Sequence, residues 1–147
     1  MKALNQPRNL QIISAVLAVI GVGISLYLFY SKMSKSSILC TPGSECDAVN
    51  ASSYSMLLGI PVSAIGAVGY LAILALALWA IFARDNAPTW LANARLVLVC
   101  GGLFFAAYLT GIEAFVLHAY CIWCVTQAIA MLGIFAALLY ERRLEAE

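Results

Sequence analysis

Four long apolar segments, separated by short polar stretches, make up most of this chain. They extend over about residues 10–30, 57–82, 91–117 and 121–140. A bilayer core of about 30 Å takes roughly 20 apolar residues in a helix, and none of the segments shows the strict alternation of a barrel strand. We therefore predict an all-α membrane protein, with one domain over residues 1–147 that forms a bundle of four transmembrane helices.

The composition agrees with this prediction. Of the 147 residues, 64% are hydrophobic and 10% are charged, whereas about 25% of the residues of soluble domains are charged. These values exclude a water-soluble globular protein. The formal net charge is +1, and no basic run is longer than Arg142-Arg143, so the chain has no electrostatic surface for nucleic acid.

Lysine and arginine residues are unevenly divided between the two ends of the predicted helices. With the N-terminus inside, the outer side carries Lys32 and Lys35, and the inner side carries Lys2, Arg8, Arg84, Arg95, Arg142 and Arg143. Cytoplasmic loops carry the excess of positive charge. We expect both termini in the cytoplasm, with the loop over residues 31–56 and the turn at 118–120 on the outer face, where disulfides persist.

Four of the five cysteines fall in two close pairs on the predicted outer face. Cys40 and Cys46 lie in the long loop, and Cys121 and Cys124 open the fourth segment. The Pro-Gly step between Cys40 and Cys46 allows a tight turn, so the spacing favours pairing within each motif. A ring of seven residues gains only roughly 2.4 kcal/mol from loop-closure entropy, which favours redox chemistry over a structural role for the loop pair.

The Cys121-Ile-Trp-Cys124 motif has the i, i+3 spacing that places two side chains on one side of a helix. The start of a helix also has unpaired N–H groups and partial positive charge, which stabilise a thiolate. Beside an apolar interior, such a pair can pass electrons from a water-facing thiol to an acceptor dissolved in the membrane. The residues alone leave two alternatives open, a zinc site formed by the four cysteines and two purely structural disulfides.

Three further features of the apolar segments call for an interpretation. Cys100 has no partner in the sequence, and we predict a small buried hydrophobic residue in the third helix. Glu113 is the one acidic residue within an apolar segment, a costly position unless it faces a polar cavity or the interface. Glu113 and the nearby His118 either transfer protons to a redox acceptor or are solvated at the water boundary. Small residues such as Gly21 and Gly102 are predicted to let helices pack closely.

The cysteine pattern and its surroundings resemble bacterial homologues of vitamin K epoxide reductase. The residues that carry the resemblance are the loop pair, the stretch from Cys46 to Tyr54, Gly59-Ile-Pro-Val-Ser63 and Cys121-Ile-Trp-Cys124. The resemblance spans about residues 10–140 and agrees in the type, the order and the topology of these motifs. Disulfide-bond oxidases of the DsbB type are functional analogues, but their Cys-x-x-Cys motif lies in the first outer loop.

This resemblance implies a quinone-dependent thiol oxidoreductase of the bacterial inner membrane that drives disulfide formation in exported proteins. It implies that Cys40 exchanges with a thioredoxin-like (DsbA-like) protein and that Cys46 attacks the Cys121–Cys124 disulfide at Cys121, each step being a thiolate attack on a disulfide. Cys124 would then face ubiquinone or menaquinone, and no metal is expected. Many bacterial members carry a fused thioredoxin-like domain, but none follows the helices here, so we expect the partner to be a separate protein.

Two more residues are candidates for the quinone pocket. Ser52, six residues after Cys46, matches a serine near the quinone site of the family, and the alternative for it is an N-cap or an ordinary polar position. Trp123 either lines an aromatic pocket or anchors the helix at the membrane interface. The same residues also fit a vitamin K-type quinone reductase that runs on the same relay, or a disulfide-stabilised four-helix scaffold without turnover.

Overall fold

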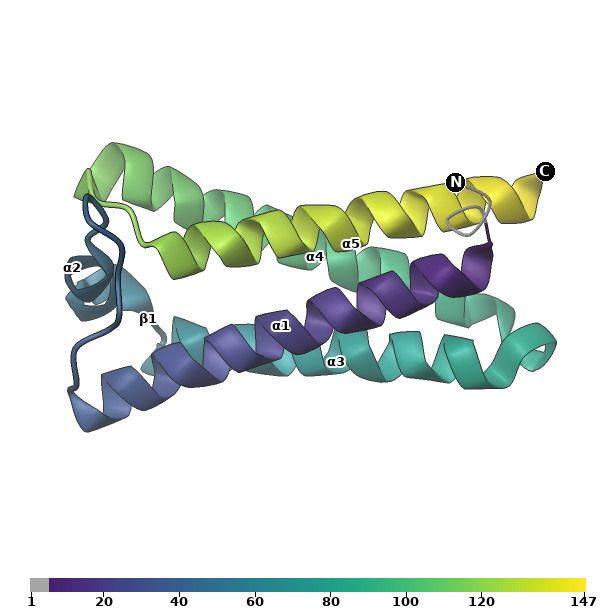
Figure 1. The fold of residues 1–147 in the computed structure, drawn as a ribbon, viewed down its shortest axis with the longest axis horizontal. Coiled ribbons are helices and arrows are strands. Elements are labelled where there is room, and N and C mark those ends of the chain that lie inside the picture. The colour runs from purple at the N-terminus through teal and green to yellow at the C-terminus, as the bar shows by residue number, and fades with distance from the viewer. Residues whose placement is uncertain (1–5) are drawn as a thin grey trace.

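Four long helices form an elongated bundle in the computed structural model, which describes residues 6–147 (Figure 1). They are α1 (Pro7–Ser34), α3 (Val62–Ala83), α4 (Thr89–Ile112) and α5 (Ile122–Ala146). Each of them is long and apolar enough to cross a membrane. The predicted all-α bundle of four transmembrane helices is therefore confirmed, while the prediction for Lys2 falls outside the described residues.

Prolines set the starting points of three of these helices. Pro7 lies in the first turn of α1, and Pro61 and Pro88 directly precede α3 and α4. A proline at the start of a helix loses no helical hydrogen bond, and its fixed φ suits the first turn. Pro61 therefore lies directly before the second membrane helix and does not bend it.

Residues 57–61, which we expected at the start of the second helix, belong to a small β-hairpin. Strand β1 (Met56–Leu57) pairs antiparallel with strand β2 (Ile60–Pro61). The two residues between the strands, Leu58 and Gly59, have φ values of 53° and 81°, as a two-residue hairpin turn requires. The apolar run hid this turn because its residues are as hydrophobic as those of the helix that follows.

The remaining short elements lie at the ends of the long helices. A helix of six residues, α2 (Cys46–Ala51), and a 3-10 turn, η2 (Ser53–Ser55), connect the loop after α1 to the hairpin. A second 3-10 turn, η3 (Arg84–Asn86), connects α3 to α4, and α4 continues into a five-residue π-helical turn, η4 (Glu113–Leu117). Helix α5 extends past the predicted end at residue 140, so the charged tail is helical.

The core lies where α1, α3, α4 and α5 meet in the middle of the bundle. Its buried side chains are Ala18, Tyr70, Ile73, Val99, Met131, Ile134 and Leu138. Close packing depends on glycine at two places, because a Cβ at Gly21 would overlap the Tyr70 ring and a Cβ at Gly102 would overlap the end of Met131. The prediction for Cys100 is wrong, since this residue is exposed on the outside of α4.

A buried ion pair connects three helices near the end of the bundle that holds the C-terminus. Arg95 on α4 donates two hydrogen bonds to the carboxylate of Glu141 on α5, at 2.9 and 3.0 Å. Gln11 on α1 donates a third to the same carboxylate at 2.7 Å. Both charged side chains are less than 10% exposed, so Arg95, one of the positive residues of the predicted inner side, is neutralised inside the bundle.

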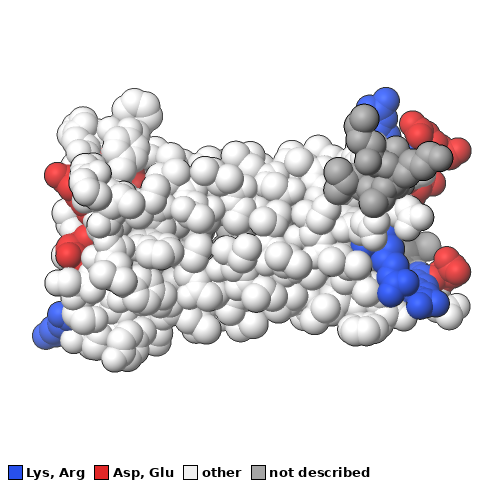
Figure 2. Space-filling model, in the orientation of Figure 1, with Lys and Arg blue, Asp and Glu red and all other residues white. Residues whose placement is uncertain are grey.

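Charged side chains gather at the two ends of the bundle and leave an uncharged band between them (Figure 2). The end with the C-terminus, called the terminal end here, carries most of the lysine and arginine side chains on the face shown in Figure 2. The opposite end, called the cysteine end, is formed by the loop that contains Cys40 and Cys46, by α2, by the hairpin and by the turn before α5. An uncharged band of this kind suits the hydrocarbon core of a bilayer.

Candidate active site

The two cysteine pairs meet at the cysteine end. Cys40 and Cys46 form a disulfide, as their spacing predicted, and Cys121 and Cys124 are free thiols. Cys40 is exposed, whereas Cys46 and Cys121 are each 1% exposed and belong to one buried cluster. The loop disulfide therefore has one sulfur accessible from outside and the other in the same cluster as the membrane pair.

Ser44 fastens the loop to the start of α5. Its hydroxyl accepts a hydrogen bond from the backbone N–H of Ile122 at 3.0 Å and donates one to the carbonyl of Tyr120 at 3.0 Å. The same oxygen lies 3.4 Å from Cys46 Sγ, and the backbone N–H of Glu45 also bonds the Tyr120 carbonyl, at 2.7 Å. Sequence reasoning missed this role of Ser44, because serine is common in any polar loop.

Trp123 supports the loop and is not among the residues that line the cavity described below. Its indole N–H donates to the carbonyl of Leu39 at 2.6 Å, and its ring meets the ring of Tyr27 edge to face at 5.4 Å. The hydroxyl of Tyr27 accepts the N–H of Leu39 at 3.0 Å. Both backbone groups of Leu39, the residue before Cys40, are thus held by aromatic side chains.

Cys121 lies where a thiolate is stabilised, directly before the first turn of α5. A hydrogen bond with the Cys124 thiol, helped by the backbone N–H groups of Trp123 and Cys124, outweighs burial and lowers the pKa of Cys121 from 9.0 to about 7. Cys121 is therefore substantially ionised near neutral pH. This agrees with the expectation that the start of a helix activates the first cysteine of the motif.

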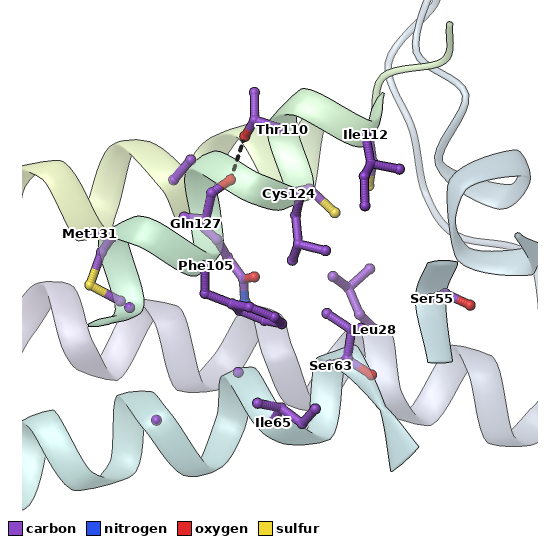
Figure 3. A pocket seen from close by; sticks show the side chains of 18 of the residues that line it. Leu28, Ser55, Ser63, Ile65, Phe105, Thr110, Ile112, Cys124, Gln127 and Met131 are labelled. Carbon is purple, nitrogen blue, oxygen red and sulfur yellow. Dashed lines mark hydrogen bonds between the residues drawn. The ribbon is translucent and has the colours of Figure 1, made fainter. Parts of the chain in front are cut away.

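A cavity of about 440 Å³ lies beside the two thiols, with walls formed by α3, α4 and α5 and by the segment from α2 to η2 (Figure 3). This volume is within the usual range for a small-molecule site. Most of the lining is apolar, for example Leu28, Ile65, Phe105, Ile112 and Met131. The polar or ionisable side chains at the cavity are Asn50, Ser52, Tyr54, Ser55, Ser63, Tyr70, Thr110, Glu113, Cys121, Cys124 and Gln127.

Two serines at the cavity differ in whether their hydroxyls are already used. The Ser52 hydroxyl donates to the carbonyl of Val49 at 2.7 Å, so it caps the end of α2 and not the start of the second membrane helix. The Ser63 hydroxyl is buried and has no hydrogen-bond partner. A buried hydroxyl without a partner is uncommon and calls for a ligand or a water. Figure 3 shows Ser63 on α3 and Cys124 on α5, on different walls of the cavity.

Glu113 also lines the cavity, and the residue is almost completely buried, at 4% exposure. Its Oε2 accepts the backbone N–H of Cys121 at 3.3 Å, and its side chain forms a hydrogen bond with the Cys124 thiol. The solvated alternative is therefore wrong for Glu113. His118, by contrast, is exposed.

One comparison with known proteins identifies the family. The model of the vitamin K epoxide reductase family matches residues 12–139. The chain belongs to this family. Membership makes the protein a multi-pass membrane oxidoreductase whose redox chemistry is linked to quinone. An apolar cavity that adjoins a free dithiol and contains an unpartnered hydroxyl fits a quinone head group, since its carbonyl oxygens accept hydrogen bonds.

The zinc alternative finds no support in this geometry. It requires free thiolates at all four positions, and Cys40 and Cys46 are joined to each other. Among residues 6–147, no group of three or more histidine, cysteine, aspartate or glutamate side chains is arranged to hold a metal ion. The remaining thiols lie close to the loop pair, since Cys121 belongs to the same buried cluster as Cys46 and Cys124 packs against that cluster.

Proposed function

We propose that this protein is a quinone-dependent thiol oxidoreductase that reoxidises a separate thioredoxin-like protein for disulfide formation in exported proteins. The observation that carries the proposal is the order of the four sulfurs. Exposed Cys40 is bonded to buried Cys46, which shares a cluster with Cys121, and the Cys124 thiol beside Cys121 lines an apolar cavity. This order leads from the aqueous surface to a site for a lipid-soluble acceptor.

The first half of the cycle oxidises the partner protein. A partner thiolate attacks Cys40, the exposed sulfur, and Cys46 leaves as a thiolate. The second partner thiol then attacks the mixed disulfide and displaces Cys40, so the partner leaves with a disulfide and the loop holds two thiols. Ser44 keeps Cys46 against the start of α5 during this step, because its bonds to Ile122 and Tyr120 do not depend on the loop disulfide.

The second half passes the two electrons to the membrane pair. The Cys46 thiolate attacks Cys121 in the Cys121–Cys124 disulfide, and Cys124 leaves. Cys40 then attacks Cys46, which displaces Cys121 and restores the loop disulfide. The redox state of the structure, with the loop pair oxidised and the membrane pair reduced, is the product of this transfer.

The quinone, ubiquinone or menaquinone, supplies the two-electron acceptor in the cavity. We assign the hydrogen bond to its carbonyl oxygen to the Ser63 hydroxyl, which has no other partner, with Ser52 as a weaker candidate because its proton is used by Val49. Cys124 remains the cysteine that faces the quinone. We assign Trp123 to the loop, which it holds through Leu39.

The charges at the two ends favour an orientation with both termini in the cytoplasm of a bacterium. Arg8, Arg84, Arg142 and Arg143 lie at the terminal end, whereas the cysteine end has Lys32 and Lys35. Lys32 is engaged there by the Asn50 carbonyl and the Ser55 hydroxyl. With positive charge inside, the cysteine end faces the oxidising side of the inner membrane, where exported proteins fold.

The test is steady-state quinone reduction by the purified protein in detergent, supplied with a reduced thioredoxin-like protein. Turnover should occur with the unaltered chain and with Cys100→Ala, and it should disappear in Cys40→Ala and Cys124→Ala. Loss in both variants, with unchanged thermal unfolding, supports the relay. A folded protein that reduces none of the quinones with any dithiol partner contradicts the proposal and favours the scaffold alternative. Turnover with quinol and an oxidised partner, but none with quinone and a reduced partner, would show that electrons flow from quinol to the partner. That result would contradict the proposed direction.

A further inference from the structure

The carboxyl group of Glu113 lies at the point where the redox thiols meet the cavity. It accepts the backbone N–H of Cys121 at 3.3 Å, forms a hydrogen bond with the Cys124 thiol and lines the cavity wall. We propose that Glu113 is a catalytic acid–base residue that carries protons from the Cys121–Cys124 dithiol to the quinone. This inference rests on the proposed function and adds the proton path to it.

The helix before Glu113 ends in a way that directs its side chain to the thiols. At this residue α4 widens into the π-helical turn η4, and the Glu113 carbonyl accepts the N–H of Ala119 at 3.1 Å. The chain then returns so that Cys121 lies over the carboxyl group. Such π-helical turns are frequent at functional sites, and here the turn brings a residue of α4 within hydrogen-bond distance of Cys121.

A comparison with the other buried glutamate separates a structural from a chemical role. Glu141 is neutralised by two hydrogen bonds from Arg95. Among residues 6–147, no lysine or arginine lines the cavity at Glu113, and the partners of its carboxyl group are a backbone N–H and a thiol. A buried carboxyl group without a cationic partner destabilises the fold. A contribution to stability therefore does not explain why a glutamate occupies position 113.

The other ionisable groups at the cavity are less suited to the task. The Tyr70 hydroxyl donates to the Gln127 carbonyl at 2.6 Å, and the Tyr54 side chain is 43% exposed. His118, on the turn that follows η4, is exposed and does not line the cavity. Glu113 is the one carboxylic acid among the lining residues of the described chain, and it touches a reacting thiol.

The proton and electron balance of the step is simple. One S–S bond forms between Cys121 and Cys124, and two electrons and two protons pass to the quinone, which becomes the quinol. The Glu113 carboxylate takes the proton of Cys124 and releases it to one quinone oxygen. The second proton comes from the Cys121 thiol or, where Cys121 is already ionised, from solvent, and Glu113 passes it to the other oxygen, so the carboxylate is regenerated.

The experiment measures the two half-reactions separately in Glu113→Gln, which keeps the size of the side chain and an oxygen that can accept the Cys121 N–H. General acid–base groups contribute about 10²–10⁴-fold, so quinone reduction by the prereduced variant should be at least about 100-fold slower. Transfer from the reduced loop pair to the Cys121–Cys124 disulfide should stay within about threefold. In the unaltered protein, quinone reduction should also show a solvent deuterium isotope effect, which is independent of whether the variant folds.

Each result decides between the possibilities. Equal slowing of both half-reactions indicates that Glu113 only positions Cys121, and it overturns the proposal. So does quinone reduction by Glu113→Gln within about threefold of the unaltered rate, or the absence of an isotope effect in the unaltered protein if the variant does not fold. If the unaltered protein reduces no quinone at all, the proposed function fails instead. Quinone reduction measured on the unaltered protein separates that outcome from a failure of the role proposed for Glu113.

Discussion

The Ser44 hydroxyl accepts the backbone N–H of Ile122 at 3.0 Å and so holds the cysteine loop against the first turn of α5. The same oxygen lies 3.4 Å from Cys46 Sγ. One side chain therefore fixes the nucleophile of the loop pair relative to the membrane pair. In the proposed relay, electron transfer between the two pairs depends on this placement, because a thiolate attacks a disulfide only within contact distance.

Replacing Ser44 should slow the transfer between the pairs. A typical hydrogen bond contributes about 1 kcal/mol, so Ser44→Ala should form the Cys46–Cys121 bond about fivefold more slowly or in lower yield. The measurement is trapping of this bond in a Cys40→Ala background in which the Cys121–Cys124 disulfide has first been formed, so that Cys46 attacks Cys121 and Cys124 leaves as a thiolate. Ser44→Thr keeps the hydroxyl and is the matched control. Equal trapping in Ser44→Ala and Ser44→Thr would show that the hydrogen bonds of the Ser44 hydroxyl have no kinetic role.

Cys121 should react as a thiolate near neutral pH. Because its pKa is lowered to about 7, the thiolate fraction rises with pH through 7 and falls about tenfold per pH unit below it. The rate of alkylation in a Cys40→Ala/Cys46→Ala/Cys100→Ala background should follow this curve. Cys124→Ala removes the largest stabilising hydrogen bond, so the midpoint should move up toward 9. An unchanged midpoint would mean that the Cys124 thiol does not stabilise the Cys121 thiolate.

The unpartnered hydroxyl of Ser63 should contribute to quinone affinity. A typical hydrogen bond is worth about 1 kcal/mol, so Ser63→Ala should raise the KM for quinone several-fold with little change in kcat. Ser52→Ala is the comparison, since its hydroxyl donates to Val49 and should matter less. The KM values of both variants decide the point, and a larger effect at Ser52 would reverse the assignment.

The ion pair between Arg95 and Glu141 should affect stability and not redox chemistry, because it lies toward the terminal end. Removing one partner of a buried pair costs about 3–5 kcal/mol, so Glu141→Ala should lower the thermal unfolding midpoint strongly. The double variant Arg95→Met/Glu141→Leu removes both charges and should recover much of this loss. The unfolding midpoints of the unaltered protein and of both variants are measured by thermal unfolding in detergent. A double variant as unstable as Glu141→Ala would indicate that the pair contributes more than mutual neutralisation.

The sequence predicted the bundle and the cysteine pairs well, because each depends on information local to the chain. Long apolar runs locate the membrane helices, and the Cys-x-x-Cys motif opens the last of these runs, which places it at the start of α5. The hairpin around Leu58 and Gly59 was missed because hydropathy does not distinguish an apolar turn from an apolar helix.

The features that needed the structure are contacts between distant segments. Ser44 meets residues near Cys121, and Arg95 meets Glu141, across separations that no local pattern encodes. The burial of Glu113 depends on the π-helical turn and on the return of the chain over it. Trp123 was a candidate for the pocket because of its place in the motif, but the direction of its side chain follows from the loop that it contacts.

The measurement that tests the relay most directly is the amount of quinol formed by fully reduced protein in a single turnover. With two dithiol pairs in series, the unaltered protein should produce about two quinols per chain. Cys40→Ala keeps only the membrane pair and should produce about one, and Cys124→Ala should produce none. One quinol from the unaltered protein would mean that the loop pair does not feed the membrane pair. Any stoichiometric quinol from Cys124→Ala would contradict the assignment of Cys124 as the thiol that faces the quinone.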